Sequence, residues 1–268
     1  MENYSLIEAR NISVEIRSKK LLDDISLQMR GGEILAVVGQ NGAGKSTLRK
    51  VLCGDLPPTG GAVTMNGKPL ADWTLNERAR VRAVLPQDSS LSFPFTVLEV
   101  VLMGRAPHVK AAETEKDYRI AREALAEVDA LHLETRIYPT LSGGERQRVH
   151  LARVLAQIWE TSEGEKRYLL LDEPTSNLDL THQHGVLKIA RKFARAGAAV
   201  LIILHDLNLA AQYADRISIL KHGKACAFGA PEKVFTAETI QESFGVAVSV
   251  INHPFFECPL IIWRDDAG

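Results

Sequence analysis

The sequence has few cysteines and no long apolar segment, and both absences restrict its function. Cys53, Cys226 and Cys258 lie far apart without C-x-x-C or Cys/His spacing, so neither a disulfide framework nor a zinc site is indicated. The longest apolar run, Ala196–Leu204, is less than half of the about 20 residues that a membrane-spanning helix needs. Residues Met1–Tyr4 lack the basic-then-apolar pattern of a signal peptide. We therefore expect a reduced, cytoplasmic protein, which could still dock on a membrane protein.

An excess of basic charge is also absent. Lys and Arg number 32 and Asp and Glu number 33, whereas dedicated nucleic-acid binders usually carry a basic surplus. The content of 46% hydrophobic and 24% charged residues is that of an ordinary globular protein. The length of 268 residues accommodates one large domain or two small ones. We expect a globular protein with no nucleic-acid partner.

Short apolar runs alternate with helical patterns along much of the chain, which favours an α/β fold. Ile34–Val38, Tyr168–Leu171 and Ala198–Leu204 are continuous apolar runs typical of buried parallel strands. Near the start, Leu6–Ala9 and Asn11–Ile16 resemble separate strands. The sequence therefore predicts a mainly parallel sheet preceded by further strands.

Two other regions have patterns of their own. Asn66-Gly67 predicts a type I′ hairpin, and a second hairpin is expected across His222-Gly223. From about residue 88 to residue 160 the pattern is mainly helical, and it includes an amphipathic helix predicted over Ala111–Val128. This middle region is expected to be a helical insertion.

A glycine-rich loop stands between an apolar strand and a predicted helix that begins at Lys45. Gly39-Gln40-Asn41-Gly42-Ala43-Gly44-Lys45-Ser46 fits the phosphate-loop pattern G-x-x-x-x-G-K-[ST], and Thr47 follows it. In such a loop backbone N–H groups surround phosphate oxygens, Lys45 adds positive charge for the β- and γ-phosphates, and Ser46 can ligate Mg²⁺. Because the strand, the spacing, Lys45 and Ser46 all agree, this loop is predicted to bind a nucleotide rather than to form a plain turn.

Acidic and imidazole side chains follow two other predicted strands. Asp172 and Glu173 end the run from Tyr168, and His205 ends the run from Ala198. Since ligands in open α/β sheets bind beyond the carboxyl ends of the strands, all three are expected near the phosphate loop. Asp172 can hold Mg²⁺ through water, Glu173 can polarise an attacking water, and His205 can contact the γ-phosphate. Taken alone, an acid pair or a histidine at a strand end is often only structural.

A second candidate phosphate site begins a later helix. Ser142 and Glu145 form a capping box that opens a helix extending to about Gln157. Gly143 and Gly144 in its first turn are poor helix formers, each costing about 1 kcal/mol relative to alanine. Their presence makes sense if bare backbone N–H groups must approach an anion closely.

In this order, the four motifs resemble those of ATP-binding-cassette (ABC) ATPases, and the resemblance covers nearly the whole chain. Leu141–Gln147 matches the family signature, Gln87 the Q-loop glutamine, Ser176–Asp179 the D-loop and His205 the switch histidine. The resemblance implies the ABC ATPase fold of the P-loop NTPases. It also implies a head-to-tail dimer in which each ATP lies between one copy's phosphate loop and the other copy's signature.

The resemblance assigns roles to individual residues and an ATP-hydrolysing activity with Mg²⁺ as cofactor. Catalytic roles fall to Glu173, His205 and Gln87, and Mg²⁺ is expected at Ser46, Gln87 and Asp172. The partner copy's ATP is expected to meet Ser142, Gly143, Gly144, Glu145 and Asp179. Ile16 stands where family members often place an aromatic residue against adenine, so only apolar contact is expected there.

A single ABC ATPase domain over residues 1–268 is implied. Within it, residues 1–87 and 161–243 are expected to form the core with an N-terminal antiparallel β subdomain. Residues 88–160 are expected to form a helical subdomain, and residues 244–268 a C-terminal tail without a clear pattern.

Further segments are similar to ATPase subunits of importers for haem, iron-siderophores and cobalamin. Phe93–Val97 and Met103–His108 carry this similarity, and the segments 160–166, 180–184 and 229–235 favour the haem importers in particular. The resemblance implies two transmembrane permease subunits, a periplasmic binding protein as an indirect partner, and a location on the cytoplasmic face of the bacterial inner membrane. His182 and His184 point about 200° apart on a helix and cannot clamp one iron together.

Two other classes of function are also compatible with the sequence. One is a soluble ABC ATPase of translation or DNA repair, although the chain has one phosphate loop, one signature and no long heptad run. The other is a nucleotide-binding module without hydrolysis, against which the presence of Glu173 and His205 argues. Co-purification with membranes and a phosphate-release assay would separate these from an importer.

Overall fold

The central element of the protein is a mainly parallel sheet. A computed structural model describes residues 5–87, 91–160, 166–176 and 178–264. In these residues the strand order of the central sheet is β10-β9-β3-β8-β7-β6, and β10 alone runs antiparallel to its neighbour. Its strands are β3 (Ile34–Gly39), β6 (Arg82–Leu85), β7 (Tyr168–Asp172), β8 (Ala199–Ile203), β9 (Arg216–Lys221) and β10 (Lys224–Gly229).

The apolar runs predicted to be buried parallel strands are confirmed. Every residue of β3, β7 and β8 is buried, because both faces of the sheet are covered. Alternate residues of β3 enter opposite cores: Ala36 packs against the helices, and Val37 packs against α1 and the N-terminal strands. Strand β6 was not predicted, since four residues that include Arg82 carry too short an apolar signal.

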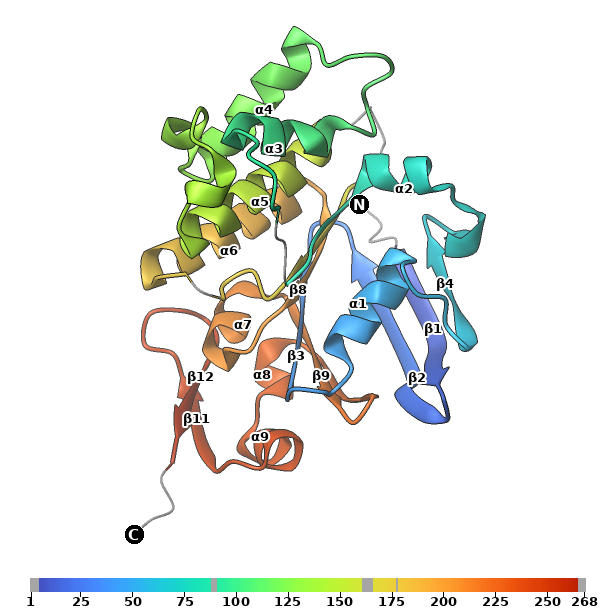
Figure 1. Ribbon diagram of the computed structural model, residues 1–268. Coiled ribbons are helices and arrows are strands. Elements are labelled where there is room, and N and C mark those ends of the chain that lie inside the picture. Colours follow the sequence, from blue (N-terminus) through green and yellow to red (C-terminus); the bar gives the residue numbers. More distant parts are fainter. Residues whose placement is uncertain (1–4, 88–90, 161–165, 177, 265–268) are drawn as a thin grey trace.

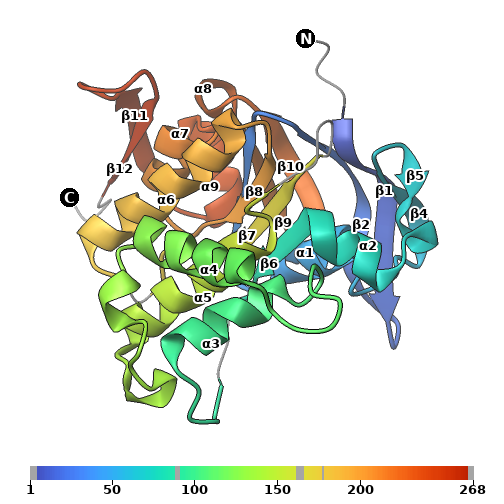
Figure 2. The ribbon, with the colours of Figure 1, turned by 90° about the horizontal axis from the view of Figure 1, so that it is seen from above.

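A second, antiparallel sheet covers one face of the first. Its order is β2-β1-β4-β5, from β1 (Ser5–Ile16), β2 (Lys19–Arg30), β4 (Gly60–Met65) and β5 (Lys68–Pro69). Helix α1 (Lys45–Cys53) lies between the two sheets and contacts β2, β3 and β7 (Figures 1 and 2). The two strands predicted in place of β1 are one strand, whose register with β2 shifts where Asn11 adopts a φ of 48°. The type I′ turn is confirmed by φ values of 53° at Asn66 and 75° at Gly67.

Helices gather at one end of the molecule and on the other face of the central sheet (Figure 1). The first group is α2 (Leu75–Val81), α3 (Val97–Leu102), α4 (Glu115–Glu127) and α5 (Gly143–Gln157), with short 3-10 segments at Leu70–Asp72, Met103–Arg105, Leu131–Leu133 and Tyr138–Thr140. The second group is α6 (Leu180–Arg195), α7 (Leu207–Tyr213), α8 (Pro231–Val234) and α9 (Ala237–Phe244). The helix predicted from Ala111 begins only at Glu115, because Thr114 forms a capping box with Asp117.

The C-terminal tail, for which no pattern was predicted, forms a hairpin of β11 (Val248–Asn252) and β12 (Pro259–Trp263). The Asn208 side chain on α7 fixes it, since Asn208 Nδ2 donates to the carbonyl of Ile261 (3.0 Å) and Asn208 Oδ1 accepts from the N–H of Ile261 (2.8 Å). Among the residues that the structure describes, no helix is both long enough and apolar enough to cross a membrane.

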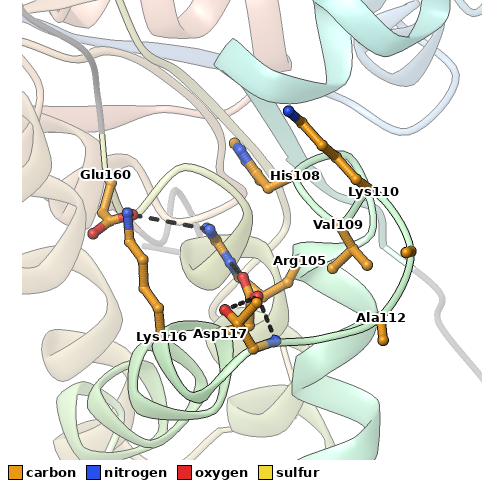
Figure 3. Close-up of a pocket in the computed structure, with 10 residues that line it drawn as sticks. Arg105, His108, Val109, Lys110, Ala112, Lys116, Asp117 and Glu160 are labelled. Carbon is orange, nitrogen blue, oxygen red and sulfur yellow. Dashed lines mark hydrogen bonds and ion pairs between the residues drawn. The ribbon is translucent and has the colours of Figure 1, made fainter.

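A buried ion pair braces the helical region (Figure 3). Arg105 Nε donates to Asp117 Oδ1 (3.0 Å), and Arg105 Nη1 donates to the carbonyl of Ala156 (2.8 Å), which joins the start of α4 to the end of α5. The surrounding pocket of about 840 Å³ also contains Lys116, whose Nζ lies 2.7 Å from Glu160 Oε2. Because Arg105, Lys116, Asp117 and Glu160 pair with one another, we interpret this pocket as structural.

We expect the substitution Asp117→Ala to lower the free energy of unfolding by about 3 kcal/mol, because it leaves the buried Arg105 charge without its closest partner. Burial raises the pKa of Asp117, but hydrogen bonds from Thr114 and Arg105 outweigh burial and hold the pKa at about 2. This folded-state pKa lies below that of the unfolded chain, about 3.9. The stabilisation is therefore complete above about pH 4 and is lost as the pH falls towards 2.

Urea unfolding of Asp117→Ala and the unchanged protein between pH 7 and pH 2.5 measures this difference. The matched control is Glu115→Ala, an exposed carboxylate in the same helical turn. A difference that does not shrink with falling pH would contradict the ion-pair assignment.

Candidate functional site

The phosphate loop has the backbone that its glycines permit. Gly42 and Gly44 have φ values of 77° and 106°, in the region that favours glycine. A Cβ atom on Gly44 would lie 2.8 Å from the carbonyl oxygen of Leu21 on β2. The loop therefore packs closely against the N-terminal sheet, and its residues 42–44 lead directly into the N-terminus of α1. Such a curled loop at a helix N-terminus is suited to binding phosphate.

Lys45 is folded back across the loop. Lys45 Nζ donates to the carbonyl oxygens of Gly39 (2.7 Å) and Gln40 (3.1 Å), and the residue is only 6% exposed. Burial lowers the pKa of Lys45, while the nearby carboxylates of Glu173 and Asp172 oppose this effect. A phosphate group would supply the negative partner that these two carbonyls provide only in part.

Most of the residues predicted around the phosphates line one cavity of about 700 Å³, whereas Gly39, Gln40, Asp172 and His205 are not among its lining residues. It is lined by Asn41, Gly42, Ala43, Gly44, Lys45, Ser46 and Thr47 of the loop, by Gln87 and Glu173, and by Lys19, Lys20, Leu21, His222 and Gly223. Of the predicted loop residues, Gln40 points elsewhere, and its Nε2 donates to the carbonyl of Phe244 at the end of α9 (2.8 Å). The cavity is of the size that binds small molecules.

Three predicted residues meet through their side chains at the carboxyl edge of the sheet. Gln87 follows β6, Glu173 follows β7 and His205 follows β8, and these strands are parallel neighbours. Gln87 Nε2 donates to Glu173 Oε2 (2.8 Å), and His205 Nε2 lies 2.5 Å from Glu173 Oε1. The carboxylate of Glu173 is therefore held on both oxygens beside the cavity, where a water molecule could be activated.

The backbone of Glu173 is unusual for a residue with a side chain. Its φ is 51°, and its N–H donates to the carbonyl of Ile203 on β8 (3.1 Å). A non-glycine residue in this left-handed region costs about 1–3 kcal/mol and is found most often where function requires it. This strain directs the carboxylate towards Gln87 and His205.

Asp172 lies deeper than Glu173 and pairs with a residue that the sequence did not point to. Arg49 Nε on α1 donates to Asp172 Oδ2 (2.9 Å). Burial raises the pKa of Asp172, and the charge and hydrogen bond of Arg49 lower it. Oδ1 of Asp172 is buried without a hydrogen-bond partner among the described residues. A buried acceptor of this kind fits a magnesium-bound water, so the donor set suits Mg²⁺.

The signature residues lie away from this cavity within the same chain. Ser142 caps α5, and its Oγ accepts from the N–H of Glu145 (3.3 Å), which confirms the predicted capping box. A Cβ atom built on the exposed Gly143 would meet nothing within 4 Å. Asp179 caps α6 and accepts from the N–H of His182 (2.9 Å). None of Ser142, Gly143, Gly144, Glu145 and Asp179 lines the phosphate-loop cavity.

Sequence reasoning missed several residues that line the cavity. Lys19 and Lys20 follow the tip of the β1–β2 hairpin, and His222 and Gly223 form the β9–β10 turn beside the phosphate loop. The Gly223 N–H donates to the carbonyl of Ala43 (3.0 Å), so this turn supports the loop. Asn177 of the D-loop, Asp88 beside Gln87 and the segment 161–165 lie outside the described residues.

Known proteins resemble this chain over most of its length. A family model described as ABC transporter matches residues 22–176, which include the phosphate loop, the signature and Glu173. This chain belongs to the ABC transporter family. ATP hydrolysis is therefore the reaction of this chain.

Two relatives and two solved structures show how closely other ABC proteins match. Hemin import ATP-binding protein HmuV of Gloeobacter violaceus is 58% identical over 257 residues, which cover 96% of this chain and 94% of that protein. HmuV of Pseudomonas putida is 55% identical over 247 residues, covering 92% and 95%. A metal-chelate type ABC transporter in an inward-facing conformation matches with a TM-score of 0.81 and 28% identity, covering 97% and 98%. A dimeric bacterial ABC transporter cassette matches with a TM-score of 0.73 and 25% identity, covering 84% and 98%.

Replacing Lys45 tests the phosphate loop of this ABC ATPase directly. We expect Lys45→Ala to weaken ATP binding by about 10- to 100-fold, because a charged hydrogen bond to a phosphate contributes about 1.5–3 kcal/mol. Isothermal titration calorimetry with ATP measures the affinity. Lys50→Ala, an exposed lysine of the same helix, is the control. Unchanged affinity of Lys45→Ala would show that this loop does not bind the phosphates.

Proposed function

We propose that this chain is the ATP-hydrolysing subunit of a bacterial ABC importer for haem. The observation that carries the proposal is the 58% identity to a hemin import ATP-binding protein over 96% of this chain. Gln87 and Glu173 line one cavity with the phosphate loop, and His205 contacts Glu173, which supports hydrolysis as the power source.

In this proposal Glu173 is the general base for water that attacks the γ-phosphate. Gln87 and His205 hold its two oxygens, so the carboxylate is oriented before ATP arrives. Once a phosphate is bound, His205 can turn its Nε2 hydrogen from Glu173 to a γ-phosphate oxygen, which links the state of the nucleotide to the position of α7. The backbone of residues 42–46 and the Lys45 charge stabilise the phosphates.

The second half of the site is proposed to come from another copy of the chain. Ser142, Gly143, Gly144, Glu145 and Asp179 do not line the cavity of their own chain, yet Gly143 is exposed and open at a helix N-terminus. A head-to-tail dimer would place these groups over the partner's ATP. The dimeric ABC cassette among the solved structures supports this arrangement.

Mg²⁺ is the proposed cofactor. The Ser46 hydroxyl and the side-chain amide oxygen of Gln87 would hold it directly, and Asp172 would hold it through water. This is consistent with the unpartnered Oδ1 of Asp172. When bound, it would neutralise charge on the β- and γ-phosphates. The Arg49–Asp172 pair fixes this carboxylate between α1 and β7 and thereby maintains its position.

Two transmembrane permease subunits are the proposed partners, with a periplasmic binding protein as an indirect one. The proposed location is the cytoplasmic face of the inner membrane. The proposed division is a core over 1–87 and 161–243, with the helical subdomain over 88–160 and the tail over 244–268. ATP would close the dimer, hydrolysis would reopen it, and the permease would follow.

Reconstituted transport tests this function. The chain and its permease subunits are placed in liposomes with ATP inside, and uptake of haem, an iron-siderophore and cobalamin is compared. We expect ATP-dependent uptake of haem alone. Uptake of only the siderophore or cobalamin would transfer the proposal to that substrate, and co-purification of the chain with ribosomes or DNA rather than with membranes would favour a soluble ABC ATPase.

A further inference from the structure

A groove that shares no lining residue with the ATP cavity is formed by α6, α7 and the loop of the tail hairpin. One wall is a face of α6 that carries His184, Lys188 and Arg195, and the other includes Tyr213 of α7 with His253 and Phe256 of the hairpin loop. Its volume is about 1020 Å³. The hairpin loop reaches the side of α6 in Figure 1, so the groove depends on the tail being docked.

The α6 wall of the groove carries positive charge that is only partly neutralised. Arg191 pairs with Asp215 (2.7 Å). Lys192 pairs with Glu127 (2.5 Å). In the part of the chain that the structure describes, Lys188 and Arg195 are exposed and form no ion pair. The groove therefore favours a ligand with separated negative charges.

His184 has the kind of hydrogen-bond partner that fixes the tautomer of a metal-binding histidine. Its Nδ1 lies 2.9 Å from the hydroxyl of the buried Tyr213, and the side chain is partly buried. This contact allows either direction; when Nδ1–H donates to the tyrosine oxygen, Nε2 carries the lone pair that a metal requires. Because His182 bonds to Asp179 outside this groove, His184 acts alone.

The hairpin wall is aromatic and offers a hydrogen-bond donor. The rings of His253 and Phe256 lie 4.8 Å apart, and Phe256 is 49% exposed. The N–H of Phe255 donates to His253 Nδ1 (3.1 Å). Neutral His253 therefore keeps its hydrogen on Nε2, which makes it a donor to a carboxylate rather than a second metal ligand.

We propose that this groove binds an iron porphyrin that carries carboxylates, with the Nε2 lone pair of His184 displacing a water from the ferric iron. The flat apolar ring would lie against Phe256 and the His253 ring, and its carboxylates would meet Lys188 and Arg195. Lys188 lies one helical turn, about 6 Å, along α6 from His184. The inference rests on the proposed haem import, since it places a site for the cargo on the ATPase itself.

Hemin titration of the purified full-length chain, free of any histidine tag, tests the proposal. Absorbance in the Soret region measures stoichiometry and affinity. We expect one saturable site. His184→Ala should weaken its affinity for hemin more than about tenfold. Tyr213→Phe, which keeps the ring but removes the group that orients His184, should weaken this affinity by about tenfold. Lys188→Gln, at an exposed position of α6, is expected to weaken binding by about tenfold. His132→Ala, an exposed histidine outside the groove, is the matched control.

Iron-free protoporphyrin separates ligation from adsorption. We expect it to bind more weakly than hemin and to be insensitive to His184→Ala, while remaining sensitive to Lys188→Gln. Hemin binding that His184→Ala leaves unchanged, or that His132→Ala weakens equally, would overturn the proposal. ATP hydrolysis by the same variants reports folding, since none of these side chains lines the ATP cavity. Haem uptake in liposomes with no groove binding would refute this site alone, whereas binding with no uptake would refute the transport function alone.

Discussion

The substitution Glu173→Gln is expected to leave ATP binding intact and to slow hydrolysis by about 10²–10⁴-fold, the usual contribution of a general base. Glutamine keeps the shape and the hydrogen bond to His205 or Gln87, but it cannot accept a proton from water. The variant is therefore expected to accumulate as an ATP-bound dimer. Single-turnover phosphate release and size-exclusion chromatography with ATP measure the two effects.

Two further variants distinguish chemistry from folding in this experiment. Glu113→Gln, an exposed carboxylate, should hydrolyse ATP at the normal rate. Glu173→Gly removes the carboxylate together with the cost of a φ of 51°, so its folded state should be at least as stable as that of the unchanged protein. Near-normal turnover in Glu173→Gln would contradict the assignment of Glu173 as the base.

The sequence was sufficient to predict the centre of the fold because the signals there are local. The β3 run enters a glycine loop and then α1, and each of these elements has its own pattern within a few residues. Because ligands in open α/β sheets bind beyond the carboxyl ends of the strands, Glu173 and His205 could be predicted near the loop without knowledge of the strand order. Their contact with each other and with Gln87 follows from β6, β7 and β8 being adjacent.

The remaining parts of the site depend on contacts between distant segments, which no local pattern encodes. Arg49 occupies an ordinary helix position, and only the packing of α1 on β7 brings it to Asp172. His222 enters the cavity because β9 pairs with β3, and Lys19 because the N-terminal sheet packs beside the loop. The tail hairpin was missed for the same reason, since the Asn208 side chain fixes it from another element.

The substitution Ser142→Arg tests whether the signature serves a partner's ATP. It removes a helix cap that contributes about 0.5–2 kcal/mol, which a domain of this size should survive. It also places a bulky side chain where Gly143 is now open. We expect normal nucleotide binding through the chain's own phosphate loop and a fall in hydrolysis of about 10³-fold, the scale of other groups supplied in trans to a γ-phosphate.

The control for this variant is available in the same chain. Thr74 caps α2 with a capping box of the same kind, formed with Glu77, and it lies away from the ATP cavity. Thr74→Arg therefore introduces the same side chain and loses an equivalent cap. Loss of stability in both variants, with loss of hydrolysis only in Ser142→Arg, would assign the effect to the signature. Full activity of Ser142→Arg alone would remove the case for a shared site.

Mixing Ser142→Arg with Lys45→Ala protein gives the sharpest test of the head-to-tail arrangement. In each mixed dimer one site combines an intact phosphate loop with an intact signature, and the other site carries both defects. If the chains pair at random, half of the dimers are mixed and each has one complete site, so we expect about a quarter of normal hydrolysis from two inactive proteins. A site formed within one chain could not be restored in this way, because each chain would keep its own defect. Recovery on mixing therefore requires that the signature of one copy completes the ATP site of the other.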